Sequence, residues 1–306
     1  MMPLGGIDKA LISQRSRAVI EHPTYPTLYR VARTQQATVD LFRLRPEENW
    51  QPDWQRLRAM MNAGADLLAI THPNNPTGST ITADELHAAI QIAHDSKARL
   101  ISDETYRLLT DGHPLPPAAS ADPSAVSIST MSKTYGLPGL RIGWIACRDT
   151  DLMKRLVACR EHITITNNTL GEHIALEVLR SAQAYIARAR DRVTRNRAVV
   201  AATVAAHPRL DWVPPAAGVV GFPWITGASE AQCRDLYRSM AEDRKTLVIP
   251  STGFELPDTY FRIGFGTDPA ELRTGLGQLT TALDELGGTP AVPGPQRTRQ
   301  IRKVRP

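Results

Sequence analysis

The sequence has few cysteines and no long apolar run. Its three cysteines, Cys147, Cys159 and Cys233, are widely spaced and form no CxxC pair, so neither a disulfide framework nor a zinc site is expected. No apolar run approaches the ~20 residues that a membrane-spanning helix needs, and the first residues lack the basic and apolar regions of a signal peptide. We therefore expect reduced thiols in a cytoplasmic protein that does not bind a membrane.

The sequence also lacks paired histidines and a basic body. Its eight histidines form no HxH or HxxxH pair, so no metal site is expected. The formal net charge is +5, but residues 289–306 contain five Lys or Arg and no acidic residue, and so carry all of it. A neutral body with a short basic tail is not typical of a nucleic-acid-binding protein. The tail is rich in Pro and Gly, and we expect it to be disordered.

The remaining sequence is typical of a globular α/β protein. Apolar residues make up 42% and charged residues 22% of the chain. Helix-prone stretches alternate with short apolar runs that read as buried strands, at residues 18–20, 67–70, 98–101, 126–129 and 142–145. A capping box at residues 82–85 (TADE) predicts the start of a helix over 86–95. This alternation predicts a layered α/β sheet with mostly parallel strands.

The second half of the chain has a different pattern. Residues 151–204 are charged and helix-prone, which would suit a helix that leaves the sheet and bridges to a second unit. Short strands are then expected at 218–225, 247–250 and 260–266, before a helix at 269–286. We divide the chain into a large α/β domain that includes the bridging helix (1–190), a small α+β domain (191–288) and the tail (289–306).

One lysine has an unusual setting. Lys133 follows a predicted strand in a hydroxyl-rich turn, at the kind of position where parallel α/β sheets bind ligands. Desolvation and the nearby Arg141 would lower the pKa of its amine, and the flanking hydroxyls with Arg141 could hold a phosphate. On spacing alone, a nucleophilic lysine and a surface lysine in a glycine-rich loop stand as equal alternatives.

The surrounding segment, residues 130–144 (TMSKTYGLPGLRIGW), resembles the cofactor-lysine signature of the class I and II aminotransferases, which are pyridoxal-phosphate (PLP) enzymes of fold type I. Further segments resemble elements of this family in the family's own order: residues 5–11 (GGIDKAL), 23–26 (PTYP), 72–78 (HPNNPTG), 102–106 (SDETY) and 261–266 (FRIGFG). Each segment alone would be read as a turn, a core residue or a surface charge. The resemblance covers about residues 3–288. It implies a mostly parallel sheet with helices on both faces and a smaller C-terminal α+β domain.

The resemblance also implies a role for each matching residue. Lys133 would carry PLP as a Schiff base and act as general base, Asp103 would pair with the pyridinium nitrogen, and Arg262 would bind the substrate carboxylate. Asn75 and Tyr106 would hydrogen-bond the cofactor's phenolate oxygen. The other implied cofactor contacts are the ring-stacking Tyr25 and the phosphate-binding residues Gly6, Ile7, Thr130, Ser132 and Arg141.

As a whole, the resemblance implies a homodimeric aminotransferase that moves an amino group between an L-amino acid and a 2-oxo acid. Residues 44–47 (LRPE), 132–141 and 218–223 are also similar to capreomycidine-synthase-like enzymes, which leaves a PLP-dependent cyclase or lyase as the alternative. Family members carry a longer segment before the phosphate-binding turn. A mis-assigned start, a fragment and a genuinely shortened enzyme are all open; the last predicts reduced activity, or an inactive paralogue that binds PLP without turnover.

Overall fold

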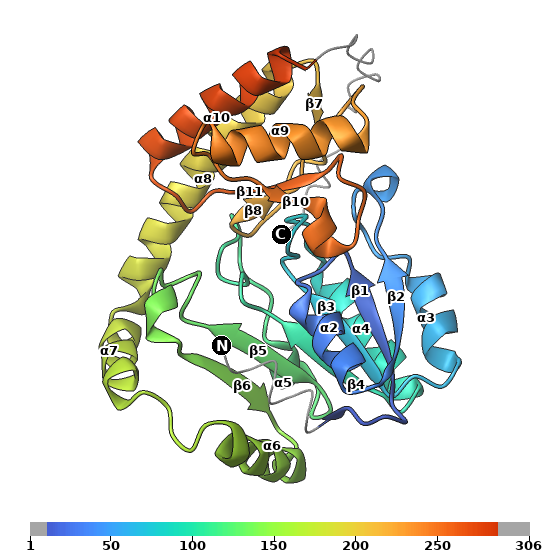
Figure 1. Ribbon diagram of the computed structural model, residues 1–306. Helices are drawn as coiled ribbons and strands as arrows, with labels where there is room; N and C mark the ends of the chain where they lie inside the picture. The colour runs from blue at the N-terminus through green and yellow to red at the C-terminus, as the bar shows by residue number, and fades with distance from the viewer. Residues whose placement is uncertain (1–10, 287–306) are drawn as a thin grey trace.

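The computed structural model describes residues 11–286, built around a six-stranded sheet in the order β2-β1-β3-β4-β5-β6 (Figure 1). The strands β1 to β5 pair in parallel, and β6 runs antiparallel to β5. Because β2 and β3 lie on opposite sides of β1, the direction of winding reverses at β1, where open α/β sheets bind ligands. The strands are β1 (Arg17–His22), β2 (Thr38–Arg43), β3 (Leu67–Thr71), β4 (Arg99–Asp103), β5 (Val126–Thr130) and β6 (Gly143–Cys147).

Helices cover both faces of this sheet, as expected. Successive strand residues point to opposite faces, so Val19 and Leu68 belong to the core on one side, and Ala18 and Leu67 to the core on the other. The first core includes side chains from α3 (Trp54–Asn62), α4 (Ala83–Asp95) and α5 (Ala118–Ala121). The second includes side chains from α2 (Thr27–Thr34) and α6 (Thr150–Ile163). The sheet is therefore buried on both sides, and its edges are where a site can open.

One local expectation is confirmed by the structure, and one strand was not expected. The capping box that opens α4 is present: the Thr82 hydroxyl accepts from the Glu85 amide at 3.2 Å, and the Glu85 carboxylate accepts from the Thr82 amide at 2.8 Å. The edge strand β2 was not expected, because its sequence TVDLFR mixes charged and apolar residues. An edge strand tolerates this mixture, since one side of it faces solvent.

The expectation of a single bridging helix over residues 151–204 is wrong. The segment forms three helices: α6, α7 (Thr169–Arg180) and α8 (Ala182–Ala206). Residues 163–166 (ITIT) are β-branched, and Asn168 at the N-cap position of α7 has an extended backbone, both of which disfavour a continuous helix at this point. Only α8, with 25 residues, runs from the sheet to the C-terminal elements (Figure 1), and the expected boundary at 190 falls inside it.

The C-terminal elements form a core of their own, separate from the two cores on the faces of the large sheet, above the ends of the parallel strands (Figure 1). They are β7 (Leu210–Asp211), β8 (Val220–Gly221), β9 (Trp224–Ile225), α9 (Glu230–Glu242), β10 (Ile249–Pro250), β11 (Phe261–Gly264) and α10 (Pro269–Asp284). Phe222 and Phe254 pack into the core of the large sheet, with Phe222 beside Trp50. The two parts of the chain therefore share buried apolar surface next to the sheet edge.

Short 3-10 helices occupy residues Pro46–Glu48, Pro138–Leu140 and Ser251–Phe254. Within residues 11–286, no helix combines the length and apolarity needed to cross a membrane. The phosphate contacts expected of Gly6 and Ile7, and the expected disordered tail, lie outside the described residues.

Candidate active site

The expected site residues that follow the parallel strands, within the described part of the chain, lie at one edge of the large sheet. The five parallel strands all end there, because parallel strands present all their carboxyl ends on the same side, and four of them carry expected site residues. Tyr25 follows β1, Asn75 follows β3, and Lys133 follows β5. Asp103 is the last residue of β4, and Tyr106 comes three residues later. The order of strands in the sheet thus gathers residues that are more than a hundred positions apart in the chain, such as Tyr25 and Lys133.

Lys133 lies in a tight loop between β5 and β6. The loop is closed by backbone bonds from Met131 N to Ile142 O at 3.0 Å and from Leu137 N to Met131 O at 3.1 Å. The side chain reaches solvent, but partial desolvation lowers the pKa of its amine, and the positive charges of Arg262 and Arg141 lower it further. A larger fraction of the Lys133 amine is therefore neutral at a given pH than for an ordinary lysine.

Asp103 is a buried carboxyl group without a cationic partner among residues 11–286. It is 6% exposed, and its Oδ1 accepts a bond from the Thr105 amide at 3.0 Å. Burial raises its pKa, opposed only by the hydrogen bonds from Thr105. A buried carboxylate is costly unless a positive group or hydrogen-bond donor pairs with it. Asp103 is therefore suited to a ligand that brings a protonated nitrogen to this edge.

Tyr106 is buried three residues after the end of β4. Its ring is 4% exposed, and burial raises the pKa of its hydroxyl well above the usual value. The positive charge of Arg262 opposes this rise in pKa, and the negative charge of Asp103 adds to it. The hydroxyl stays protonated at neutral pH, so Tyr106 can donate a hydrogen bond to a ligand oxygen.

Arg262 joins the C-terminal elements to this edge. Its Nη1 donates to Asn75 Oδ1 at 2.9 Å, and its guanidinium carbon lies 5.5 Å from the centre of the Phe254 ring. Because the oxygen of Asn75 accepts this bond, its amide nitrogen is the atom that can donate to a ligand. The planar guanidinium keeps further N–H donors with which it can bind a carboxylate.

Three of the residues expected to hold a phosphate lie between the end of β5 and the start of β6. Thr130 Oγ1 accepts from the Ser132 amide at 3.2 Å, so the two hydroxyl-bearing residues lie side by side. Arg141 is exposed, and its Nη1 donates to the Pro138 carbonyl at 2.8 Å within the same loop. Tyr25 is 42% exposed, which leaves its ring available for stacking on a ligand.

Sequence analysis missed a buried polar network behind these residues. Glu21, in β1, accepts hydrogen bonds from the Thr71 amide and from Asn74, the residue before Asn75. Burial raises the pKa of Glu21 to about 7, and the charge of Asp103 adds to the rise. The signal was present in the sequence, because a single acidic residue interrupts the apolar run that forms β1.

Comparison with known proteins gives consistent relatives. The family model for aminotransferase class I and II matches residues 4–279. The chain is 31% identical over 271 residues to capreomycidine synthase from Streptomyces vinaceus, covering 88% of this chain and 68% of that protein. Two crystal structures, each 26% identical, are similar in fold. A PLP-dependent aminotransferase from Streptococcus suis has a TM-score of 0.87 over 94% of this chain and 75% of its own. The PLP-dependent cyclase OrfR has a TM-score of 0.85 over 92% of this chain and 75% of its own.

Proposed function

This chain belongs to the class I and II aminotransferases of PLP fold type I, whose members use pyridoxal phosphate, and from this premise we propose that it transfers an amino group between an L-amino acid and a 2-oxo acid. The observation that carries the proposal is the convergence of Lys133, Asp103 and Arg262 at one sheet edge. These three groups supply an amine of lowered pKa, a buried carboxylate and a carboxylate-binding guanidinium.

The residues present fit this cofactor. When bound, pyridoxal phosphate provides an electron sink for negative charge that develops at the substrate Cα. Asp103 would hold a proton on the ring nitrogen, because its buried carboxyl has no cationic partner among residues 11–286. Tyr106 and the Asn75 amide nitrogen would donate to a ring oxygen, and Tyr25 would stack on the ring. The phosphate would lie against Thr130, Ser132 and Arg141.

Two residues would act on the substrate directly. Arg262 would bind the substrate carboxylate with its guanidinium, at an orientation that is fixed by its bond to Asn75. Lys133 Nζ would hold the cofactor covalently until substrate arrives and would then remove the proton from the substrate Cα. The lowered pKa of Lys133 supports this role as a base, because a neutral amine is needed to accept a proton.

A PLP-dependent cyclase or lyase is the second candidate. It is favoured by the 31% identity to capreomycidine synthase and by the likeness to the cyclase OrfR. The same Lys133, Asp103 and Arg262 would serve, since proton removal at Cα also begins an elimination followed by ring closure. The two candidates differ in one requirement. An amino-group transfer needs a second substrate that accepts the amino group, and a cyclisation does not.

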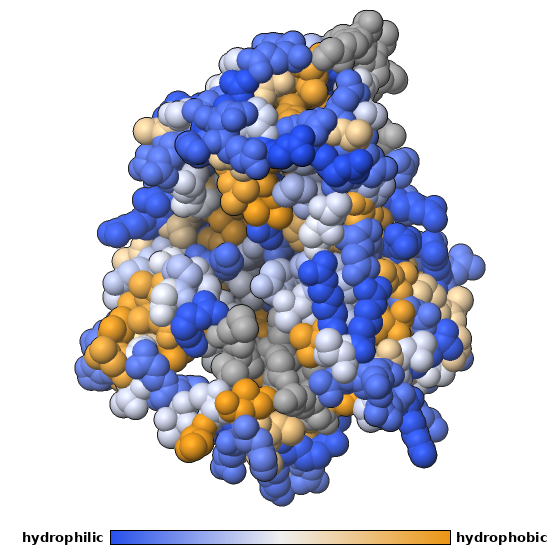
Figure 2. Space-filling model, viewed as in Figure 1, coloured by the Kyte–Doolittle hydropathy of each residue, from blue (hydrophilic) through white to orange (hydrophobic). Residues whose placement is uncertain are grey.

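We further propose that the protein acts as a homodimer, with the face around α7 as the contact surface. Apolar side chains gather over α7 in the space-filling view (Figure 2). Ile165, which precedes α7, is 81% exposed, and Leu170 in α7 is 69% exposed. Leu176 and Leu179, also in α7, are about half exposed. A second copy would bury this patch. A cytoplasmic location is also part of the proposal, and three unpaired cysteines support it.

The test is turnover with and without an amino-group acceptor. The purified chain, loaded with pyridoxal phosphate, is incubated with a panel of L-amino acids, with or without a 2-oxo acid. Transamination predicts that substrate is consumed beyond one equivalent per enzyme only when the 2-oxo acid is present. Sustained consumption without it supports the cyclase or lyase. The Lys133→Ala variant is the control. If it turns over as fast as the wild type, the proposed function is wrong under both candidates.

A further inference from the structure

A charged residue lies inside the first strand of the large sheet. Glu21 is 4% exposed, in a strand whose neighbouring residues are also buried. Its Oε2 accepts two hydrogen bonds, from the Thr71 amide at 2.9 Å and from Asn74 Nδ2 at 2.9 Å. Burying a carboxyl group is unfavourable unless its oxygens are hydrogen-bonded. An apolar residue at this position would therefore lose less free energy on burial, and we look for a functional role of the carboxyl group in the contacts that it makes.

Asn74 extends this network to two turns of the candidate site. Its Nδ2 also donates to the Pro23 carbonyl at 3.1 Å, in the turn that presents Tyr25. Its Oδ1 accepts from the Thr77 amide at 3.0 Å and from Thr77 Oγ1 at 2.8 Å, which closes the turn that presents Asn75. A single carboxyl group is thus joined to strand β3 and, through one amide side chain, to both turns.

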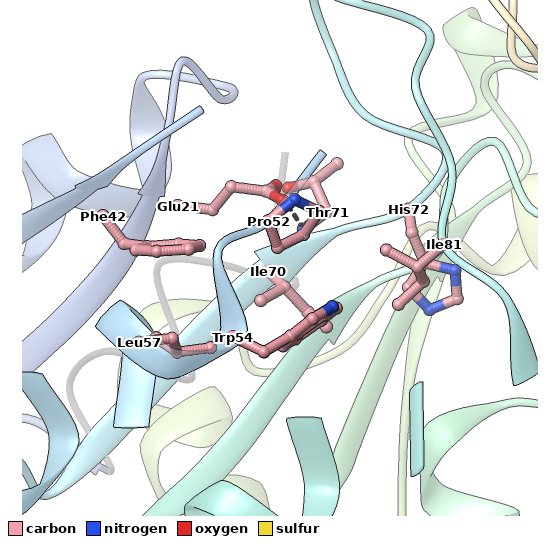
Figure 3. Close-up of a pocket in the computed structure, with 9 residues that line it drawn as sticks. All are labelled: Glu21, Phe42, Pro52, Trp54, Leu57, Ile70, Thr71, His72 and Ile81. Carbon is pink, nitrogen blue, oxygen red and sulfur yellow. Dashed lines mark hydrogen bonds between the residues drawn. The ribbon is translucent and has the colours of Figure 1, made fainter. Parts of the chain in front are cut away.

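Because Glu21 is buried, we do not expect it to contact a substrate directly. On one side it borders a cavity of about 10 Å³, lined mainly by apolar residues such as Phe42, Trp54, Leu57 and Ile70 (Figure 3). A space of this size holds about one water molecule. Glu21 can influence the site only through the groups that it binds and through its effect on nearby Asp103.

We propose that Glu21 is a positioning residue of this site, and that its carboxyl group, acting through Thr71 and Asn74, fixes the two turns that present Tyr25 and Asn75. The proposal rests on the proposed function, since these turns matter to the cofactor only if the cofactor binds there. Removal of the carboxyl group should loosen both turns together. Substitution by glutamine should preserve their geometry, because one amide oxygen can accept both hydrogen bonds.

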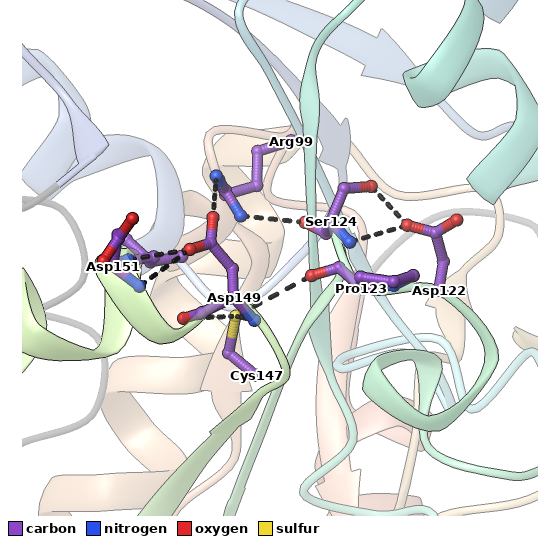
Figure 4. A network of polar contacts seen from close by, with 8 residues as sticks. Arg99, Asp122, Pro123, Ser124, Cys147, Asp149 and Asp151 are labelled. Atoms are coloured by element: carbon purple, nitrogen blue, oxygen red, sulfur yellow. Dashed lines mark hydrogen bonds and ion pairs between the residues drawn. The ribbon is translucent and has the colours of Figure 1, made fainter.

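The opposite edge of the sheet offers a matched control. Asp149 also joins separate segments through one carboxyl group (Figure 4). It accepts from Arg99 Nη2 at 2.8 Å and from the amides of Asp151 and Leu152 at 3.1 and 2.9 Å. Arg99 begins β4, whereas Asp103 ends it, so this network stands at the far end of the same strand. Asp149→Ala should weaken the fold without loosening the turns at the site.

The experiment titrates pyridoxal phosphate into the full-length wild type and into Glu21→Ala, Glu21→Gln, Asn74→Ala and Asp149→Ala, after each cofactor-free protein has been checked by its melting curve. Affinity is read from the visible absorbance, and the orientation of the bound ring from visible circular dichroism. Glu21→Ala and Asn74→Ala should bind about tenfold to a hundredfold more weakly, by analogy with the loss of metal affinity when residues that orient a metal's ligands are removed, and both should change the dichroic band. Glu21→Gln and Asp149→Ala should keep the wild-type affinity and band.

The outcomes separate this inference from the function on which it rests. If the wild type binds no pyridoxal phosphate, the proposed function fails. If the wild type binds it while Glu21→Ala and Asn74→Ala keep its affinity and dichroism, the positioning role is refuted and the function stands. Where Glu21→Ala does not fold, Asn74→Ala carries the test, because it leaves the bond between Glu21 and Thr71 in place. Equal losses in Glu21→Gln and Glu21→Ala would also overturn the proposal, since they would assign the effect to charge.

Discussion

Substitution of Glu21 by glutamine should change how the stability of the cofactor-free protein depends on pH. Burial, and to a smaller extent the charge of Asp103, raise the pKa of Glu21 from 4.5 to about 7, against the opposing hydrogen bonds from Thr71 and Asn74. Between pH 4.5 and about 7, the Glu21 carboxyl group therefore holds a proton in the folded protein that it has already released in the unfolded chain. Stability from this group is fully present below pH 4.5, declines as the pH rises, and is lost above about 7. At about 1.4 kcal/mol per pKa unit, the loss is about 3 kcal/mol.

Glutamine has no proton to lose, so the free energy of unfolding of Glu21→Gln should not fall in this window on account of position 21. Urea unfolding of both cofactor-free proteins at about pH 5 and about pH 8 measures the difference. The advantage of the variant over the wild type should grow by up to about 3 kcal/mol between the two conditions. A difference that stays constant with pH would refute the reasoning, because it would mean that the Glu21 carboxyl titrates alike in the folded and unfolded chains.

Three further substitutions have expected outcomes. Gly78→Ala should lower the free energy of unfolding by about 1–3 kcal/mol or more. The reason is that Gly78 has a φ of +69° and an added Cβ would lie 2.4 Å from Pro215 Cβ. An unchanged urea midpoint would contradict this. Arg262→Lys should raise the KM for the amino acid about tenfold to a hundredfold, since an ammonium cannot bind a carboxylate bidentately; steady-state kinetics that show the wild-type KM would remove Arg262 from the substrate site. Asp149→Ala should lower the melting temperature, because α6 loses its N-cap side chain and Arg99 loses its ion-pair partner. The kcat should stay at the wild-type value; a matching loss of activity would show that the two edges of the sheet are coupled.

Sequence patterns predicted the parts of the fold that depend on local chemistry. The strands β1, β3, β4 and β5 were expected because each is a short buried apolar run, and α4 because its capping box is local. The strand expected at 142–145 forms as β6, but the expectation that it is buried is wrong, because β6 lies at the edge of the sheet and none of its residues is buried. The edge strand β2 escaped detection because its residues need not be apolar on both faces. The breaks between α6, α7 and α8 were missed because residues 151–204 are helix-prone as a whole, and a few β-branched residues change the summed helix propensity of so long a segment very little.

The candidate site was predicted through resemblance and strand order rather than through contacts. The ends of parallel strands place Asn75, Asp103 and Lys133 together, and this follows from the topology alone. The bond between Arg262 and Asn75 joins residues 187 positions apart, and no local pattern indicates such a partner. Glu21 was missed for a related reason. Within an apolar run, a lone acidic residue shows its role only when Thr71 and Asn74 are seen beside it.

The most direct test of the proposed site is a chemical map of where pyridoxal phosphate attaches. The full-length protein is loaded with pyridoxal phosphate, reduced with borohydride and digested, and the peptides are examined by mass spectrometry. We predict a pyridoxyl group on Lys133, in the peptide that contains the loop between β5 and β6. A modification found only on lysines other than Lys133, or on no lysine at all, would contradict the assignment of Lys133 and the site built around it.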